Sequence, residues 1–229
     1  MKKFIIPILS GLSVLLAGCP SNRMMESKFV DQDAIYQKHS VSYEEEGDLT
    51  GIVSEFHVDG VNGTTLVLTE PSDVRCEDGE LRAGTYLLGG AYYYHSFNGY
   101  LPVVTVEFID YQKKSYVNRL PLPAARFTEQ TVKPGLHRTI TVAFDGPPCA
   151  KGESLQLRID GDSLSASVDA VPGGTFFSVT PADLQKFKPA ERLTLQIIRK
   201  NNGPLREATI RGGDYYTAYY SKKITTVLE

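Results

Sequence analysis

Histidines and acidic residues are the first place to look for acid–base or metal chemistry in this chain. Its four histidines are His39, His57, His95 and His137. They form no His-x-His pair and no His-Glu-x-x-His motif, so the spacings typical of zinc sites are missing. Glu55, His57 and Asp59 would share one face of a strand, but such a pattern more often forms a solvated polar face. We therefore expect no metal and no cofactor.

One serine lies in a sequence with a known nucleophile pattern. Gly161-Asp162-Ser163-Leu164 resembles the motif of the GDSL esterases and lipases, and this resemblance implies Ser163 as nucleophile with an Asp-x-x-His pair downstream. No histidine follows Ser163, because the last one is His137. A hydroxyl without a base is a weak nucleophile. We therefore predict that residues 160–163 form a hairpin turn between strands at 155–159 and 165–169.

Tyrosines are concentrated in two short clusters, at 92–94 and at 215–220. Successive side chains of a strand point to opposite faces, so part of each cluster has to lie off the core. Exposed tyrosines combine a rigid contact area with a hydrogen-bonding hydroxyl, which suits a glycan, peptide or protein partner. The alternative is cross-strand packing inside the fold. Our candidate binding residues are Tyr92, Tyr93, Tyr94, His95, Tyr215, Tyr216 and Tyr219.

The first nineteen residues have the order of features found in an export signal. Lys2-Lys3 precedes a mostly apolar run over residues 4–17, which is too short to span a membrane as a helix. The following Leu16-Ala17-Gly18-Cys19 resembles the lipobox of bacterial lipoproteins. This resemblance implies removal of residues 1–18 and a diacylglyceryl thioether on Cys19, whose acyl chains would anchor the protein. An ordinary secretory signal cut nearby is the alternative.

Two further observations bear on the compartment and on partners. Pro20 stands where inner-membrane lipoproteins of double-membraned bacteria carry Asp, which favours the outer membrane. The chain has 24 basic and 27 acidic residues, so it lacks the basic surface expected of a nucleic-acid-binding protein. If Cys19 is acylated, Cys76 and Cys149 remain as an even pair in an exported chain, which predicts a disulfide. Two buried thiols are the alternative.

From residue 49 onward the sequence has the features of β-structure. Seven Asn-Gly or Asp-Gly pairs favour tight turns, and apolar residues alternate over 104–108, 155–159 and 193–197. Thr180, Pro181 and Asp183 together predict one short helix over 181–187. We therefore expect an all-β protein of β-sandwich type with immunoglobulin-like architecture.

A Pro- and Gly-containing segment at 147–152 is the best internal boundary. We expect the lipidated cysteine and a polar tether over residues 19–46, a first β-sandwich module over 47–149 and a second over 150–229. One larger sandwich that spans both halves is the alternative.

The anchor and the strands, without any catalytic constellation, predict an envelope protein with a binding, adhesion or structural role. Its partners would be the membrane, through the lipid, and an envelope protein or a glycan. One alternative is an envelope hydrolase assembled from distant residues, with His57, His95 or His137 as the base. The other is a secretion or assembly accessory protein that pairs the strand at 217–228 with a partner.

Overall fold

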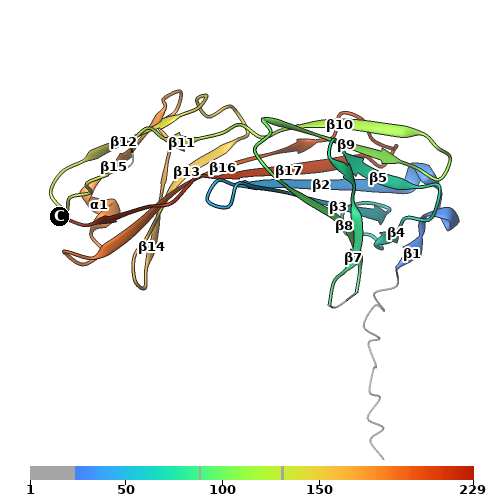
Figure 1. Cartoon of the computed structure of the whole chain (residues 1–229), viewed down its shortest axis with the longest axis horizontal. Helices are drawn as coiled ribbons and strands as arrows, with labels where there is room; N and C mark the ends of the chain where they lie inside the picture. Colours follow the sequence, from blue (N-terminus) through green and yellow to red (C-terminus); the bar gives the residue numbers. More distant parts are fainter. Residues whose placement is uncertain (1–23, 88, 130–131) are drawn as a thin grey trace, which may run out of the picture.

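The computed structural model describes residues 24–229 except 88 and 130–131, so the predicted signal segment and Cys19 lie outside the described residues. The chain is an all-β protein of layered sheets, as predicted, and its described part has one short α-helix (Figure 1). Within the same residues, no helix is both long and apolar enough to cross a membrane.

One nine-stranded sheet runs through the whole molecule. All its strand pairs are antiparallel except β17 with β2, which is parallel. In spatial order its strands are β14 (Ser165–Asp169), β13 (Ser154–Asp160), β16 (Arg192–Pro204), β17 (Gly213–Tyr220), β2 (Ile35–Glu44), β3 (Leu49–Val58), β8 (Ala91–Asn98) and β7 (Arg82–Thr85), with β18 (Ile224–Val227) also paired to β16.

Three smaller sheets complete the fold in the described part of the chain. The four-stranded sheet consists of β10 (Ser115–Pro121), β9 (Val103–Ile109), β5 (Asp73–Cys76) and β6 (Gly79–Glu80). The three-stranded sheet consists of β11 (Arg126–Phe127), β12 (Ile140–Asp145) and β15 (Phe176–Val179). The last sheet pairs β1 (Met25–Glu26) with β4 (Leu66–Val67) in parallel.

The nine-stranded sheet packs against the four-stranded and the three-stranded sheet at two separate places, which gives two hydrophobic clusters. In the first core cluster, Phe56 of β3 meets Phe108 of β9 with ring centroids 4.5 Å apart. In the second core cluster, Phe144 of β12 meets Phe177 of β15 at 5.4 Å. Each large apolar side chain buried in this way contributes about 1.5–3 kcal/mol.

Strand β16 contributes Leu193, Leu195 and Ile197 to the second cluster and pairs with β17, whose Tyr219 belongs to the first. Residues 194–200 of β16 pair with β13, residues 192–195 with β18, and residues 198–204 with β17. The clusters consequently do not follow the modules predicted on either side of residue 149. β17 joins the first cluster from the C-terminal part of the chain, whereas β12 joins the second cluster from the N-terminal part.

The segment predicted as a polar tether differs most from the expectation. Residues 35–44 form β2, which lies inside the nine-stranded sheet between β17 and β3. Ile35, Gln37, His39, Val41 and Tyr43 alternate along the strand as its buried side chains. Because two of these five inward positions are polar, the strand shows little apolar periodicity in the sequence.

Two local predictions are confirmed. The helix α1 (Pro181–Leu184) begins after Thr180, whose backbone N–H donates to the Asp183 carboxylate at 2.8 Å. The segment around Ser163 is a hairpin turn between β13 and β14, closed by a hydrogen bond from Gly161 N–H to Leu164 O at 2.9 Å.

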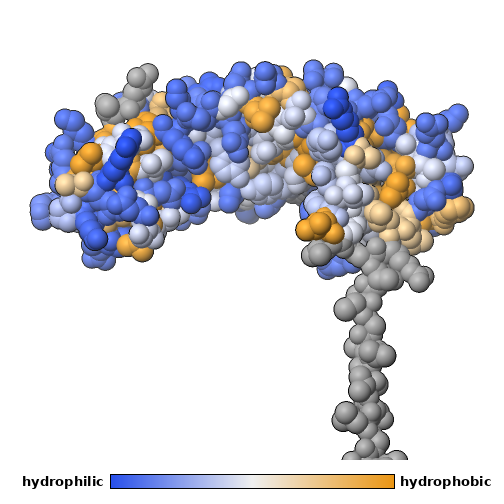
Figure 2. Space-filling model, turned by 60° about the horizontal axis from the view of Figure 1, so that its bottom comes forward, coloured by the Kyte–Doolittle hydropathy of each residue, from blue (hydrophilic) through white to orange (hydrophobic). Residues whose placement is uncertain are grey.

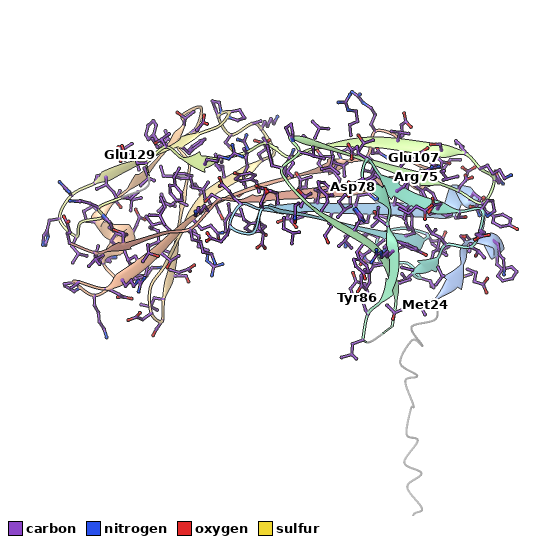
Figure 3. All side chains as sticks on the ribbon, viewed as in Figure 1. Met24, Arg75, Asp78, Tyr86, Glu107 and Glu129 are labelled. Carbon is purple, nitrogen blue, oxygen red and sulfur yellow. The ribbon has the colours of Figure 1, made fainter. Side chains whose placement is uncertain are left out.

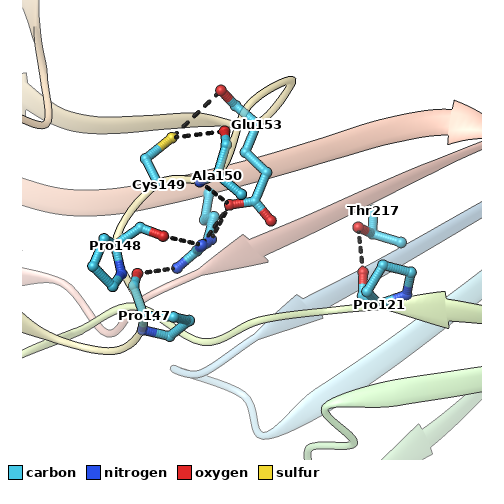
Figure 4. Close-up of polar contacts among 8 residues, drawn as sticks. Pro121, Pro147, Pro148, Cys149, Ala150, Glu153 and Thr217 are labelled. Carbon is cyan, nitrogen blue, oxygen red and sulfur yellow. Dashed lines mark hydrogen bonds and ion pairs between the residues drawn. The ribbon is translucent and has the colours of Figure 1, made fainter. Parts of the chain in front are cut away.

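A buried arginine ties β16 to the segment that leads into β13 (Figure 4). Arg199 donates to the carbonyls of Pro147 at 2.7 Å and Pro148 at 3.1 Å, and its Nε lies 3.2 Å from the Glu153 carboxylate. The side chains of Arg199 and Glu153 are only 2% and 9% exposed. Nearby, Thr217 Oγ1 of β17 donates to Pro121 O at 2.7 Å. These contacts fix the junction between the two clusters.

Candidate functional site

The histidines do not form an accessible acid–base site with a nucleophile in the described residues. His39 Nδ1 lies 2.8 Å from Ser54 Oγ, but both side chains are fully buried, and burial lowers the pKa of His39 to about 4. His57 contacts the Gly63 carbonyl at 3.3 Å. His95 contacts Asp78 at 2.9 Å. His137 is exposed.

Glu55 and Asp59, the two acidic residues beside His57, are engaged by other side chains. Glu55 accepts hydrogen bonds from Lys38 at 2.8 Å and from the Tyr86 hydroxyl at 2.5 Å. Burial opposes ionisation of Glu55, but these hydrogen bonds outweigh it and lower the pKa of the carboxyl group. Asp59 pairs with Arg211 at 3.2 Å. In residues 24–229, leaving aside the three undescribed positions, no group of three or more His, Cys, Asp or Glu side chains could hold a metal ion.

Cys76 and Cys149 are free thiols, contrary to the predicted disulfide. Cys76 packs against the first core cluster and Cys149 against the second. The Cys149 thiol contacts the carbonyl of Glu153 at 3.4 Å. The disulfide was predicted from an even number of cysteines. That number does not show where each cysteine lies, and the two cysteines pack against different clusters. Burial raises the pKa of both thiols.

The candidate tyrosines divide between the two faces of the nine-stranded sheet. Tyr93, Tyr215 and Tyr219 point toward the first core cluster. Tyr219 is fully buried and accepts a hydrogen bond from Arg126 Nε at 3.0 Å, and Tyr93 accepts one from Leu68 N–H at 2.6 Å. These three residues therefore act in packing, as the alternative interpretation of the clusters predicted.

The remaining tyrosines come together on the opposite, solvent-facing side of the sheet. Along one cross-strand row, Tyr216 of β17 pairs with Ser40, Ser40 with Val53, and Val53 with Tyr94 of β8. Three strand spacings separate Tyr216 from Tyr94, or about 14 Å between backbones. The next row contains Ala218, Ser42, Gly51 and Ser96. Small side chains thus lie between two walls of tyrosine.

These walls enclose a groove of about 480 Å³, which we name the tyrosine groove. β8 provides one wall and β17 the other, where Tyr220 extends the wall formed by Tyr216. The sequence analysis placed Tyr220 in the cluster but not among the binding residues. None of the lining residues is Asp, Glu, Lys or Arg; they are Ser40, Val41, Ser42, Gly51, Ile52, Val53, Tyr94, His95, Ser96, Tyr216 and Tyr220.

The β8 wall continues as a series of aromatic rings. The centroids of Tyr94 and Tyr92 are 5.8 Å apart, and those of Tyr92 and Tyr86 are 4.6 Å apart. Gly84 of β7 makes room for this series, because a Cβ at that position would lie 2.6 Å from the Tyr92 ring. Figure 3 shows Tyr86 on the turn that projects beyond the sheet after β7.

Two tyrosine hydroxyls along these walls have raised pKa values. Burial, together with the hydrogen bond to Glu55, raises the pKa of Tyr86 to about 12. Burial and the neighbouring Tyr220 raise the pKa of Tyr216. In Figure 1, the four-stranded sheet lies above the nine-stranded sheet, so the tyrosine groove faces downward. The groove offers aromatic faces and hydroxyl groups, and no Asp, Glu, Lys or Arg lines it.

The strand predicted to capture a partner is already paired within the chain. Residues 217–220 lie in β17, which has β16 on one side and β2 on the other. Residues 224–227 form β18, which pairs with β16. β17 consequently has no free edge for a partner strand.

Comparisons with known proteins do not identify a family. The chain matches no protein-family model, and no curated protein matches it. Among solved structures it matches the FN1–FN3 domains of chicken CNTN1 with 8% sequence identity and a TM-score of 0.25. This match covers 81% of the present chain and 66% of that chain, slightly under two thirds. A TM-score this low carries no argument, so the description of the fold rests on the strands and clusters themselves.

Proposed function

We propose that the protein is a lipid-anchored bacterial envelope protein that binds a neutral glycan chain in the tyrosine groove. The observation that carries the proposal is the lining of the groove, where tyrosine rings and serine hydroxyls occur without any formally charged side chain. Apolar faces of sugar rings pack on aromatic side chains. Serine hydroxyls both donate and accept hydrogen bonds, as the hydroxyls of a sugar require.

The sheet itself favours a glycan over an extended peptide. β17, β2, β3 and β8 are neighbours in the nine-stranded sheet, and β2 and β3 form the floor between the two walls. Their backbone N–H and C=O groups are engaged in strand pairing. Peptide recognition by strand addition needs unpaired backbone groups. A ligand in this groove therefore has to be recognised through side chains.

The lipid anchor rests on the Leu16-Ala17-Gly18-Cys19 motif. Labelling of the expressed protein with palmitate tests this part of the proposal. We expect acylation of the native chain and none of a Cys19→Ser variant. Recovery of the native protein with the outer-membrane fraction would support the outer membrane as its location, and recovery with the inner membrane would contradict it.

Glycan binding is tested on the full chain carrying Cys19→Ser, which removes the acylation site. A panel of neutral and acidic envelope oligosaccharides is screened by array, and hits are measured by calorimetry. We expect binding of a neutral oligosaccharide that is lost in Gly51→Leu, because this change fills the floor while all the tyrosines remain. The added Cβ would lie 3.5 Å from Ser42 Oγ, which is an ordinary van der Waals distance, so the variant is expected to fold.

Matched tyrosine variants complete the test. Tyr94→Ala and Tyr216→Ala remove one wall each, whereas Tyr111→Ala removes an exposed tyrosine from the turn between β9 and β10. We expect weaker binding in the first two and native binding in the third. Equal loss in all three, or a preference for acidic glycans, would contradict binding in the tyrosine groove.

A further inference from the structure

Exposed apolar side chains gather at the end of the molecule that carries β1 (Figure 2). Met25, Phe29 and Ile210 line a common depression of about 610 Å³, and Met24 precedes them in the chain. Phe29 is 72% exposed and Ile210 is 83% exposed. We name Met24, Met25, Phe29 and Ile210 the β1 patch.

The two most exposed side chains of the β1 patch are held out by well-anchored segments. Phe29 ends a short turn in which Ser27 is fully buried, with its hydroxyl 3.0 Å from Ser72 Oγ. Gln32 Nε2 also donates to the Ser27 carbonyl at 2.8 Å. The turn therefore keeps its shape while the phenyl ring stays outside the core.

The segment that carries Ile210 is anchored on both sides. The Thr209 hydroxyl donates to the carbonyl of Ile35. Arg211 N–H donates to Asp33 O at 3.1 Å, and Gly212 N–H donates to Thr209 O at 3.0 Å. Ile210 is thus fixed in an exposed position, where an apolar side chain has no role in the core of this chain.

The length of chain before Met24 indicates what the β1 patch meets. Met24 comes five positions after Cys19, and an extended chain over five positions spans at most about 18 Å. If Cys19 carries the lipid anchor of the proposed function, Met24 at the start of the patch is always within that distance of the lipidated cysteine. The bilayer is then the apolar phase within reach of the patch.

The charges around the patch select the type of contact. Asp31, Asp33 and Asp59 line the same depression, and among its described lining residues the one basic side chain, Arg211, pairs with Asp59 at 3.2 Å. Lys28, whose Nζ lies 4.7 Å from the centre of the Phe29 ring, pairs with Glu26. Binding to anionic lipid requires basic clusters, and the described residues of this surface form none. We propose, on the basis of the lipid anchor, that the β1 patch inserts apolar side chains into the interface of the anchoring membrane through neutral or zwitterionic lipids.

The absence of tryptophan from the chain gives a direct test. Phe29→Trp introduces a single indole into the acylated full-length protein, which is reconstituted into phosphatidylcholine vesicles with brominated acyl chains. We expect bromine to quench the indole, because only a side chain in the bilayer contacts the brominated segment. Ile210→Trp provides a second reporter within the patch and should behave in the same way.

Leu164→Trp is the matched control. Leu164 is 48% exposed and lies on the turn between β13 and β14, beside the second core cluster. We expect no quenching from this position, and we expect the quenching of Phe29→Trp to persist at high salt. Quenching at all three positions, quenching that salt abolishes, or none at Phe29 and Ile210 would overturn the proposed contact.

The mass of the mature protein separates this inference from the proposed anchor. An acylated protein whose indole at position 29 is not quenched overturns the membrane contact and leaves the anchor intact. An unacylated protein overturns the anchor, and this inference falls with it.

Discussion

Replacing Arg199 by Met should destabilise the protein strongly. The guanidinium group is buried and satisfies three acceptors, namely the carbonyls of Pro147 and Pro148 and the carboxylate of Glu153. Arg199→Met leaves Glu153, which is 9% exposed, as a buried charge without its cation. Removing one partner of a buried ion pair costs about 3–5 kcal/mol of folding stability, against about 0–1 kcal/mol for an exposed pair.

The measurement is the free energy of unfolding in urea for the full chain carrying Cys19→Ser. The double variant Arg199→Met/Glu153→Met removes both charges and should cost less than Arg199→Met alone, because it leaves no unpaired ion. Glu153→Met alone should be costly for the corresponding reason. A loss below about 1 kcal/mol in Arg199→Met, as for an exposed pair, would refute this account of the junction. Strict additivity of the two single variants would refute it as well.

Three further predictions concern individual side chains. The pKa of buried His39 is about 4, whereas the unfolded imidazole has a pKa near 6.5. The free energy of unfolding should therefore fall as the pH drops from about 6.5 to 4, by roughly 2 kcal/mol at pH 5. His39→Gln should flatten this pH dependence of urea unfolding, and an unchanged slope would contradict the prediction. Gly84→Val should displace the Tyr92 ring and weaken glycan binding measured by calorimetry, whereas native affinity would argue against a continuous aromatic wall. Tyr93→Phe removes the oxygen that accepts a hydrogen bond from Leu68 N–H. It should lower the free energy of unfolding in urea by about 1 kcal/mol and leave glycan affinity unchanged. A loss of affinity would place Tyr93 in the binding site.

The sequence predicted those stretches of strand whose successive inward positions are apolar. Leu193, Leu195 and Ile197 alternate in β16 and are buried in the second core cluster. β2 escaped prediction because Gln37 and His39 occupy inward positions, although the burial of the strand alternates without interruption. An alternation of apolar and polar residues predicts a half-buried strand only where the buried face is apolar. The prediction fails for a strand such as β2, whose buried face includes polar side chains.

The tyrosine groove could be predicted only in part. Side chains alternate between the two faces of β8, so Tyr93 lies on the face opposite to Tyr92 and Tyr94. Which of these tyrosines is buried depends on which face another sheet covers, and the local sequence does not show this. The row from Tyr216 to Tyr94 depends on β17 lying beside β2 in parallel. No turn or local repeat connects these two strands, so their pairing is set by tertiary packing.

The parallel pairing of β2 and β17 has a consequence for the nascent chain. β2 is synthesised well before β17, and the contact between Glu45 and Tyr219 joins residues 174 positions apart. Until β17 arrives, one edge of β2 has no partner, and unpaired strand edges promote association between chains. Synthesis of the N-terminal half therefore leaves an incomplete sheet, which has to be protected from self-association until residues 213–220 have been made.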